Sequence, residues 1–252
     1  MNYFFSINNN NLKSKLTIPK FQNRGLYNKN LKLYSLKIKE NNWIISEPTS
    51  DQDENFYYIN NDFKSENEIY MLAEKKIENS KYDLIEFSNN FLLTNPAFRC
   101  NLRVTNLAGG FSSYQSEYPA AMINKKGNIV SQVSSLLDPE NEKNILIFKN
   151  IYFQPIIKSF KAYIVDIEAK TIVSEKEFFT NSLNFWELDK KMIKPSNFFF
   201  SEGYLGIPVY YSEKNKNVSL EHTHPLQTYI LTQNMIKIVK DMKNNVQKIT
   251  FK

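Results

Sequence analysis

A succession of short strand-like segments, separated by turn residues, is the feature that most limits how this chain can fold. The segments are rich in β-branched and aromatic residues, and pairs such as Asn95-Pro96, Gly109-Gly110 and Asp138-Pro139 separate them. The predicted strands cover residues 83–94, 97–106, 111–118, 144–153, 159–167, 171–180, 197–200, 207–212 and 217–223. Many short strands at this spacing predict a mainly β protein, an antiparallel β-sandwich or jelly roll.

The N-terminal third looks different from this β-rich region. Residues 1–29 are irregular and rich in Asn, which predicts an arm, and residues 31–38 with 43–45 predict a hairpin. Capping-box spacing and apolar residues at helical intervals predict one short helix near residues 66–78.

The chain ends in a second predicted helix, which begins after Thr232. Its apolar residues recur every three or four positions, and lysines occupy the positions between them. We therefore expect an N-terminal arm and small α/β extension over residues 1–82. A β-sandwich or jelly-roll domain with a C-terminal helix would cover residues 83–252, and a single merged domain is the alternative.

Charge and cysteine content narrow the class of protein. The 252 residues carry a formal charge of +6, but the lysines are scattered among Glu and Asp, so no nucleic-acid partner is expected. The single cysteine, Cys100, excludes an intrachain disulfide framework and shares strand parity with apolar neighbours, which predicts a buried thiol. The chain has no apolar run of the ~20 residues that a membrane span needs and no secretion signal. A cytoplasmic protein is expected, and the sequence leaves open whether it forms an oligomer.

The two histidines of the chain, His222 and His224, lie one residue apart and share strand parity with Val218 and Leu220. In jelly rolls of the cupin type, a similar His-x-His pair binds a divalent metal such as Zn, Fe or Mn inside the barrel. This chain has no third histidine, so a carboxylate, Glu117 or Glu202, would have to complete the site. The alternative is a structural pair that is hydrogen-bonded at the edge of the core.

A polar strip is the second candidate site. If Gly109-Gly110 forms the turn of a hairpin, Arg103 lies opposite Ser113, Asn101 opposite Gln115, and Arg99 opposite Glu117. Guanidinium and amide groups in a row suit sugar hydroxyls, carboxylates or phosphates. The predicted hairpin of residues 207–224 would add Tyr210 near the histidines.

Three functions agree with these patterns. The first is a non-enzymatic β-sandwich protein that binds a small polar ligand or glycan through Arg99, Asn101, Arg103, Gln115, Glu117 and Tyr210. The second is a cupin-like metalloenzyme centred on the His-x-His pair, and the third is a structural or assembly module. Phosphate-binding loops, dinucleotide fingerprints and zinc-spaced cysteine pairs are missing from the sequence, which disfavours the familiar nucleotide-dependent enzymes.

Overall fold

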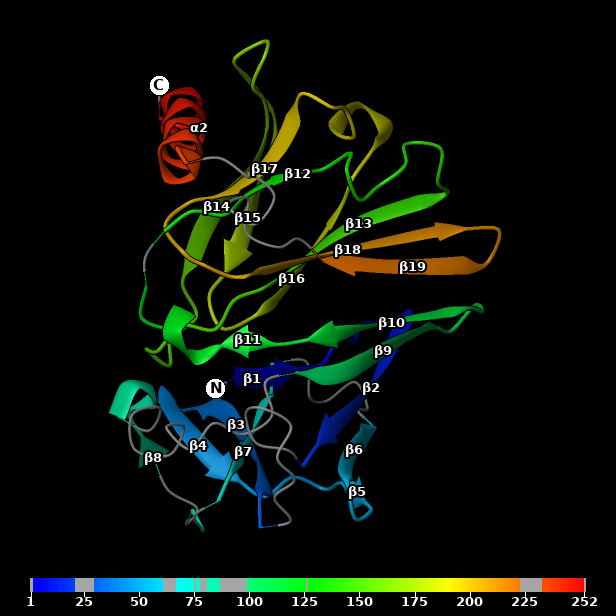
Figure 1. Cartoon of the computed structure of the whole chain (residues 1–252), viewed down its shortest axis with the longest axis vertical. Helices are drawn as coiled ribbons and strands as arrows, with labels where there is room; N and C mark the ends of the chain where they lie inside the picture. The colour runs from blue at the N-terminus through cyan, green and yellow to red at the C-terminus, as the bar shows by residue number, and fades with distance from the viewer. Residues whose placement is uncertain are drawn as a thin grey trace.

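The structure is a computed structural model of the chain and describes residues 2–20, 30–60, 67–74, 76–77, 81–86, 99–125, 127–222 and 233–251. These residues are mainly β, and their strands form four antiparallel sheets (Figure 1). Two 3-10 turns, Ala120–Met122 and Lys190–Met192, a helical turn at residues 84–86, where a strand was predicted, and the helix α2 (Met235–Thr250) complete the described elements.

The first two sheets are built from residues 2–119. The six-stranded sheet has the order β11 (Tyr118–Pro119), β1 (Asn2–Phe5), β7 (Ile69–Ala73), β3 (Lys32–Lys39), β4 (Asn42–Ser46) and β8 (Lys81–Tyr82). The five-stranded sheet has the order β10 (Phe111–Ser116), β9 (Cys100–Asn106), β2 (Leu12–Pro19), β6 (Phe56–Asn60) and β5 (Asp51–Gln52).

The other two sheets are built from residues 130–222 and have four strands each. One has the order β12 (Val130–Gln132), β17 (Asn197–Ser201), β14 (Ser159–Asp166) and β15 (Thr171–Phe179). The other has the order β16 (Leu183–Glu187), β13 (Lys143–Lys149), β18 (Ile207–Lys214) and β19 (Asn217–His222). The change from the first pair of sheets to the second therefore falls between Pro119 and Val130.

The predicted β-sandwich or jelly roll is wrong. The strands form four small antiparallel sheets in a four-blade, propeller-like arrangement. Turn spacing revealed that strands were present, but the pairings that define the sheets join distant segments, such as β1 with β11 and β2 with β9. Such pairings depend on side-chain packing across the whole molecule, so local turn chemistry does not determine them.

In the sheet of β16, β13, β18 and β19, the two middle strands, β13 and β18, are buried on both faces, and this explains the apolar run of β13. Ile145 and Ile147 join a core shared with the first two sheets, whereas Leu146 and Phe148 join a second core against the sheet of β14 and β17. A strand covered on both sides carries a continuous apolar run instead of an alternating one. We call the sheet of β16, β13, β18 and β19 the central sheet. A hydrogen bond also joins it to the first two sheets, because the hydroxyl of Tyr211 accepts from Asn106 Nδ2 at 2.9 Å.

Two predictions for the N-terminal third are also wrong. Residues 2–20 are not an arm, because they hold β1 and β2, and all four residues of β1 are buried. The helix predicted near residues 66–78 is replaced by β7, whose five residues are all buried between β1 and β3. An apolar run that is covered on both faces satisfies helical spacing by coincidence, which is why the pattern misled.

Several local predictions are confirmed. The hairpin of β3 and β4 turns at Glu40 and Asn41, both with positive φ, and the C-terminal helix is α2. Cys100 is buried, and burial raises the pKa of its thiol. Within the described residues, no helix is long and apolar enough to cross a membrane. Thr232 and residues 87–94 lie outside the described part of the chain.

Candidate functional site

The β9–β10 hairpin has the register that the sequence predicts. Arg103 pairs with Ser113 and Asn101 with Gln115, while Leu102 pairs with Tyr114 on the opposite face. Leu102 and Tyr114 are buried in the core, so the alternate residues of both strands point outward. The polar strip is therefore on the solvent-exposed face of the five-stranded sheet.

The turn of this hairpin lies against the turn of the β18–β19 hairpin. Gly110 has a φ of +80°, and a Cβ atom there would overlap the carbonyl oxygen of Lys216. Glycine is required at this position for both reasons, because it tolerates positive φ and allows two backbones to approach closely.

One end of the polar strip is neutralised internally. The guanidinium of Arg99 lies 3.5 Å from Glu117 (Nε to Oε1) and donates to Gln115 Oε1 at 3.3 Å. The other carboxylate oxygen of Glu117 accepts a 2.9 Å hydrogen bond from Asn2 Nδ2 on β1. These groups satisfy one another, so Arg99, Gln115 and Glu117 form a supporting cluster for the hairpin.

Two cations occupy the middle of the same face. Lys15 on β2 pairs directly with Arg103 on β9, and each cation lies over an aromatic ring. The Arg103 guanidinium is 3.6 Å from the centre of the Phe111 ring, and Lys15 Nζ is 5.0 Å from that of Tyr58. Like charges directly opposite each other in a sheet repel, and among the described residues no carboxylate forms an ion pair with either cation.

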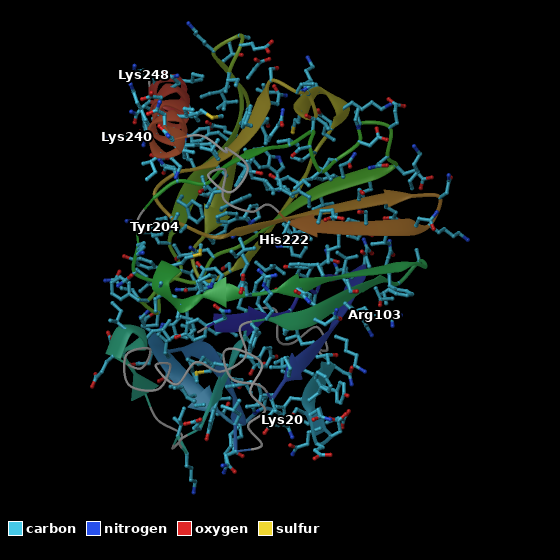
Figure 2. The ribbon with its side chains drawn as sticks, in the orientation of Figure 1. Lys20, Arg103, Tyr204, His222, Lys240 and Lys248 are labelled. Carbon is cyan, nitrogen blue, oxygen red and sulfur yellow. The ribbon has the colours of Figure 1, made fainter. Side chains whose placement is uncertain are left out.

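A shallow hollow of about 360 Å³ lies beside these cations. Its lining includes Lys13, Lys15, Arg103, Asn60 and Thr105 and contains no acidic residue. We call this surface, with Phe111, Tyr58 and Asn101, the basic face. Figure 2 shows Arg103 projecting from the β9–β10 hairpin. Asp53, near the β5 edge of the sheet, is bound by the Tyr58 hydroxyl at 2.6 Å and by two backbone N–H groups.

Sequence reasoning found Asn101 and Arg103 but missed Lys13, Lys15, Phe111 and Tyr58. The signal for the lysines was present in Leu12-Lys13-Ser14-Lys15-Leu16, which alternates apolar and polar residues as a half-buried strand does. This alternation was not recognised as a strand, because residues 1–29 were predicted to form an arm.

Tyr210 does not join the polar strip. Its side chain is buried in the second core, on the face of the central sheet away from β9 and β10. Its hydroxyl is 2.6 Å from Ser131 Oγ, and burial raises the pKa of this phenol. The structure therefore places Tyr210 in the core, apart from the other predicted ligand-binding residues.

His222 lies at the end of β19, on the side of that strand that faces the first core. Its strand pairs Leu220 with Tyr211 and His222 with Val209, and Leu220 is buried there while Glu221 is exposed on the other side. The imidazole lies against the ring of Tyr114 on β10, with the ring centres 4.9 Å apart. An aromatic contact of this kind packs β19 against β10.

The metal site stays a prediction. His224 lies outside the described residues, and within the described ranges no three His, Cys, Asp or Glu side chains gather as a metal site requires. The two carboxylates named as third ligands have other partners: Glu117 binds Arg99 and Asn2, and Glu202 accepts a hydrogen bond from Tyr163 at 3.4 Å. The jelly-roll framework on which the cupin analogy depended is also not present.

Comparison of the chain with protein-family models, with curated proteins and with solved structures finds no match.

Proposed function

We propose that this protein is a non-enzymatic binding protein whose basic face holds an acidic, carbohydrate-like ligand. The observation that supports this most is the pairing of Lys15 with Arg103. Two adjacent cations without a carboxylate partner among the described residues are unfavourable in the free protein, and an anionic ligand between them would relieve the repulsion.

The neighbouring side chains suit an acidic sugar. Asn101 and Asn60 are exposed amides, which donate to and accept from hydroxyl groups. Phe111 is 55% exposed, and the face of its ring that Arg103 does not cover offers an apolar surface to the C–H groups of a sugar ring. The ammonium and guanidinium groups of this face are hydrogen-bond donors that suit the carboxylates of an acidic ligand.

Calorimetric titration with three oligomers of similar length tests the proposal: an oligogalacturonate, a neutral dextran fragment and single-stranded DNA. We expect the acidic sugar to bind and the neutral sugar to bind at least about tenfold more weakly, because hydrogen bonds to charged groups contribute about 1.5–3 kcal/mol each. The double variant Lys15→Gln/Arg103→Gln should lose at least about tenfold in affinity for the acidic sugar.

The variant Lys190→Gln is the matched control, because Lys190 is exposed in the 3-10 turn Lys190–Met192, outside the basic face, and pairs with Glu140. It should bind the acidic sugar as the wild type does. Equal binding of DNA and oligogalacturonate would show that the basic face binds polyanions in general and does not recognise carbohydrate. Unchanged affinity in the correctly folded double variant would overturn the site itself.

A further inference from the structure

A second cavity lies far from the basic face, between α2 and the sheet of β12, β17, β14 and β15. Figure 1 shows α2 alongside this sheet, and the cavity between them has a volume of about 470 Å³. Six of its nine lining residues are apolar: Val130, Ile167, Phe198, Met242, Val246 and Ile249. Apolar cavities of only about 150 Å³ are known to bind benzene, so this one has room for an apolar ligand.

The sequence explains why the cavity is apolar on both walls. Phe198 and Phe200 on β17 and Val165 on β14 point away from the second core, and they form a third core with Val246 and Ile249 of α2. These residues are at most 8% exposed. A hydrocarbon chain between the helix and the sheet would therefore be shielded from water.

The remaining lining residues are polar, and two of them are cations. Lys170 is in the turn between β14 and β15, Lys248 is in the last turn of α2, and both are exposed. Asn245 adds an amide, and none of the nine lining residues is acidic. An apolar chamber edged by lysines matches a ligand that has a hydrocarbon chain and one negatively charged head.

We propose that this cavity binds the chain of a long-chain fatty acid, with the carboxylate held by Lys170 and Lys248. The cavity volume lies within the range of about 300–1,000 Å³ that single small-molecule ligands occupy in proteins. The charge of the edge distinguishes this ligand from a neutral hydrocarbon, which would gain nothing from the two ammonium groups.

Calorimetric titration of the full chain with octanoate, decanoate and laurate, each below its micelle concentration, and with dodecanol below its solubility limit tests the ligand class. Affinity should rise by roughly three- to fourfold for each added methylene until the cavity is filled. Laurate should bind more tightly than dodecanol by about two- to tenfold at low salt, and added salt should remove this difference.

Variants locate the site. Lys170→Gln/Lys248→Gln should weaken laurate binding by about two- to tenfold and leave dodecanol unchanged, whereas Lys170→Arg/Lys248→Arg should keep the wild-type affinity. Met242→Trp, which fills the cavity, should weaken both ligands by at least about tenfold. Lys240→Gln changes a lysine of the same helix that does not line the cavity, and it should bind laurate normally.

Circular dichroism and the melting temperature identify any variant that fails to fold. If folded Met242→Trp binds laurate as the wild type does, the cavity is not the site. If laurate shows no saturable binding to the wild type, or if it binds only as vesicles or micelles, the proposal is wrong. Equal laurate affinity in the glutamine and arginine variants would show that Lys170 and Lys248 do not bind the carboxylate.

Discussion

At the scale of single residues, Lys149 has the least favourable environment among the described side chains of the core. It follows Ile145 and Ile147 on the same face of β13, is 1% exposed, and its ammonium nitrogen has no hydrogen-bond partner within the described residues. Burial lowers the pKa of this lysine to about 7, because a charge is costly without water or a counter-ion. The sequence signal for this burial was the apolar run Ile145-Leu146-Ile147-Phe148 that precedes Lys149, and the packing of the sheets is what encloses the side chain.

This shift couples the stability of the protein to pH. Above pH 7 the folded protein holds Lys149 neutral, whereas the unfolded chain keeps its proton up to about pH 10.5. The unfolded state therefore binds more protons in this window, and stability rises with pH. From pH 7 to 9 the free energy of unfolding should gain about 2 kcal/mol from this group, because the folded protein still holds the proton about half of the time at pH 7.

Lys149→Met should stabilise the protein at pH 7 and remove that gain. Urea unfolding at pH 7, 8 and 9 measures both effects, and this range lies below the ionisation of the tyrosines. The control is Lys143→Met, because Lys143 is on the same strand but only partly buried. If the stability of Lys149→Met increases with pH as steeply as that of the wild type, another group carries the pH dependence.

At the scale of elements, the sequence predicts hairpins well and distant pairings poorly. The β9–β10 and β3–β4 hairpins follow from turn residues next to alternating strands, and both have the predicted form. The partners of β7 do not follow from its own sequence, because its five apolar residues fit a helix as well as a covered strand. For the same reason, only the β9 residues of the basic face, Asn101 and Arg103, were predicted. The strands β9 and β10 are neighbours in the sequence, whereas β2, which carries the lysines, pairs with β9 from nearly ninety residues away.

Two glycines with almost equal φ allow the free-energy cost of backbone strain to be measured apart from the cost of close packing. Gly110 has φ +80° and contacts the Lys216 carbonyl, whereas Gly203 has φ +78° and no atom within 4 Å of its would-be Cβ. Gly203→Ala should lower the free energy of unfolding by about 1–2 kcal/mol, the cost of a left-handed alanine. Gly110→Ala should cost about 3 kcal/mol or more, because the two hairpins must also move apart. Chemical denaturation measures both values, and equal losses would contradict the hairpin contact.

At the scale of the whole molecule, the cores connect all four sheets. The first core contains residues of the first two sheets together with Ile145, Val209 and Leu220 of the central sheet. The ring nitrogen of Trp43 on β4 also donates to the carbonyl of Phe153 at 2.8 Å. The pattern of strands and turns predicted a two-layer sandwich, because this pattern alone does not show that one sheet is covered on both faces. The apolar run of β13 was the signal for that arrangement.

This shared core predicts that residues 2–119 and 130–222 unfold together. The chain has two tryptophans, Trp43 in the first core and Trp186 in the second, so each can report on one part of the molecule. In Trp43→Phe and in Trp186→Phe, urea unfolding should give the same midpoint by fluorescence as by far-UV circular dichroism. Two separate midpoints within one variant would show that the parts unfold independently.

The pairing of Lys15 with Arg103 also sets folding against binding. Replacing Lys15 with glutamate would turn a repulsion into an attraction across the ladder, and such opposite-charge pairs contribute about 0.2–1 kcal/mol. A selection for thermal stability alone would therefore favour an acidic residue at this position and destroy the proposed ligand site. At Lys15 the sheet is therefore less stable than it would be with an acidic residue in that position. The proposed ligand would supply the missing negative charge there.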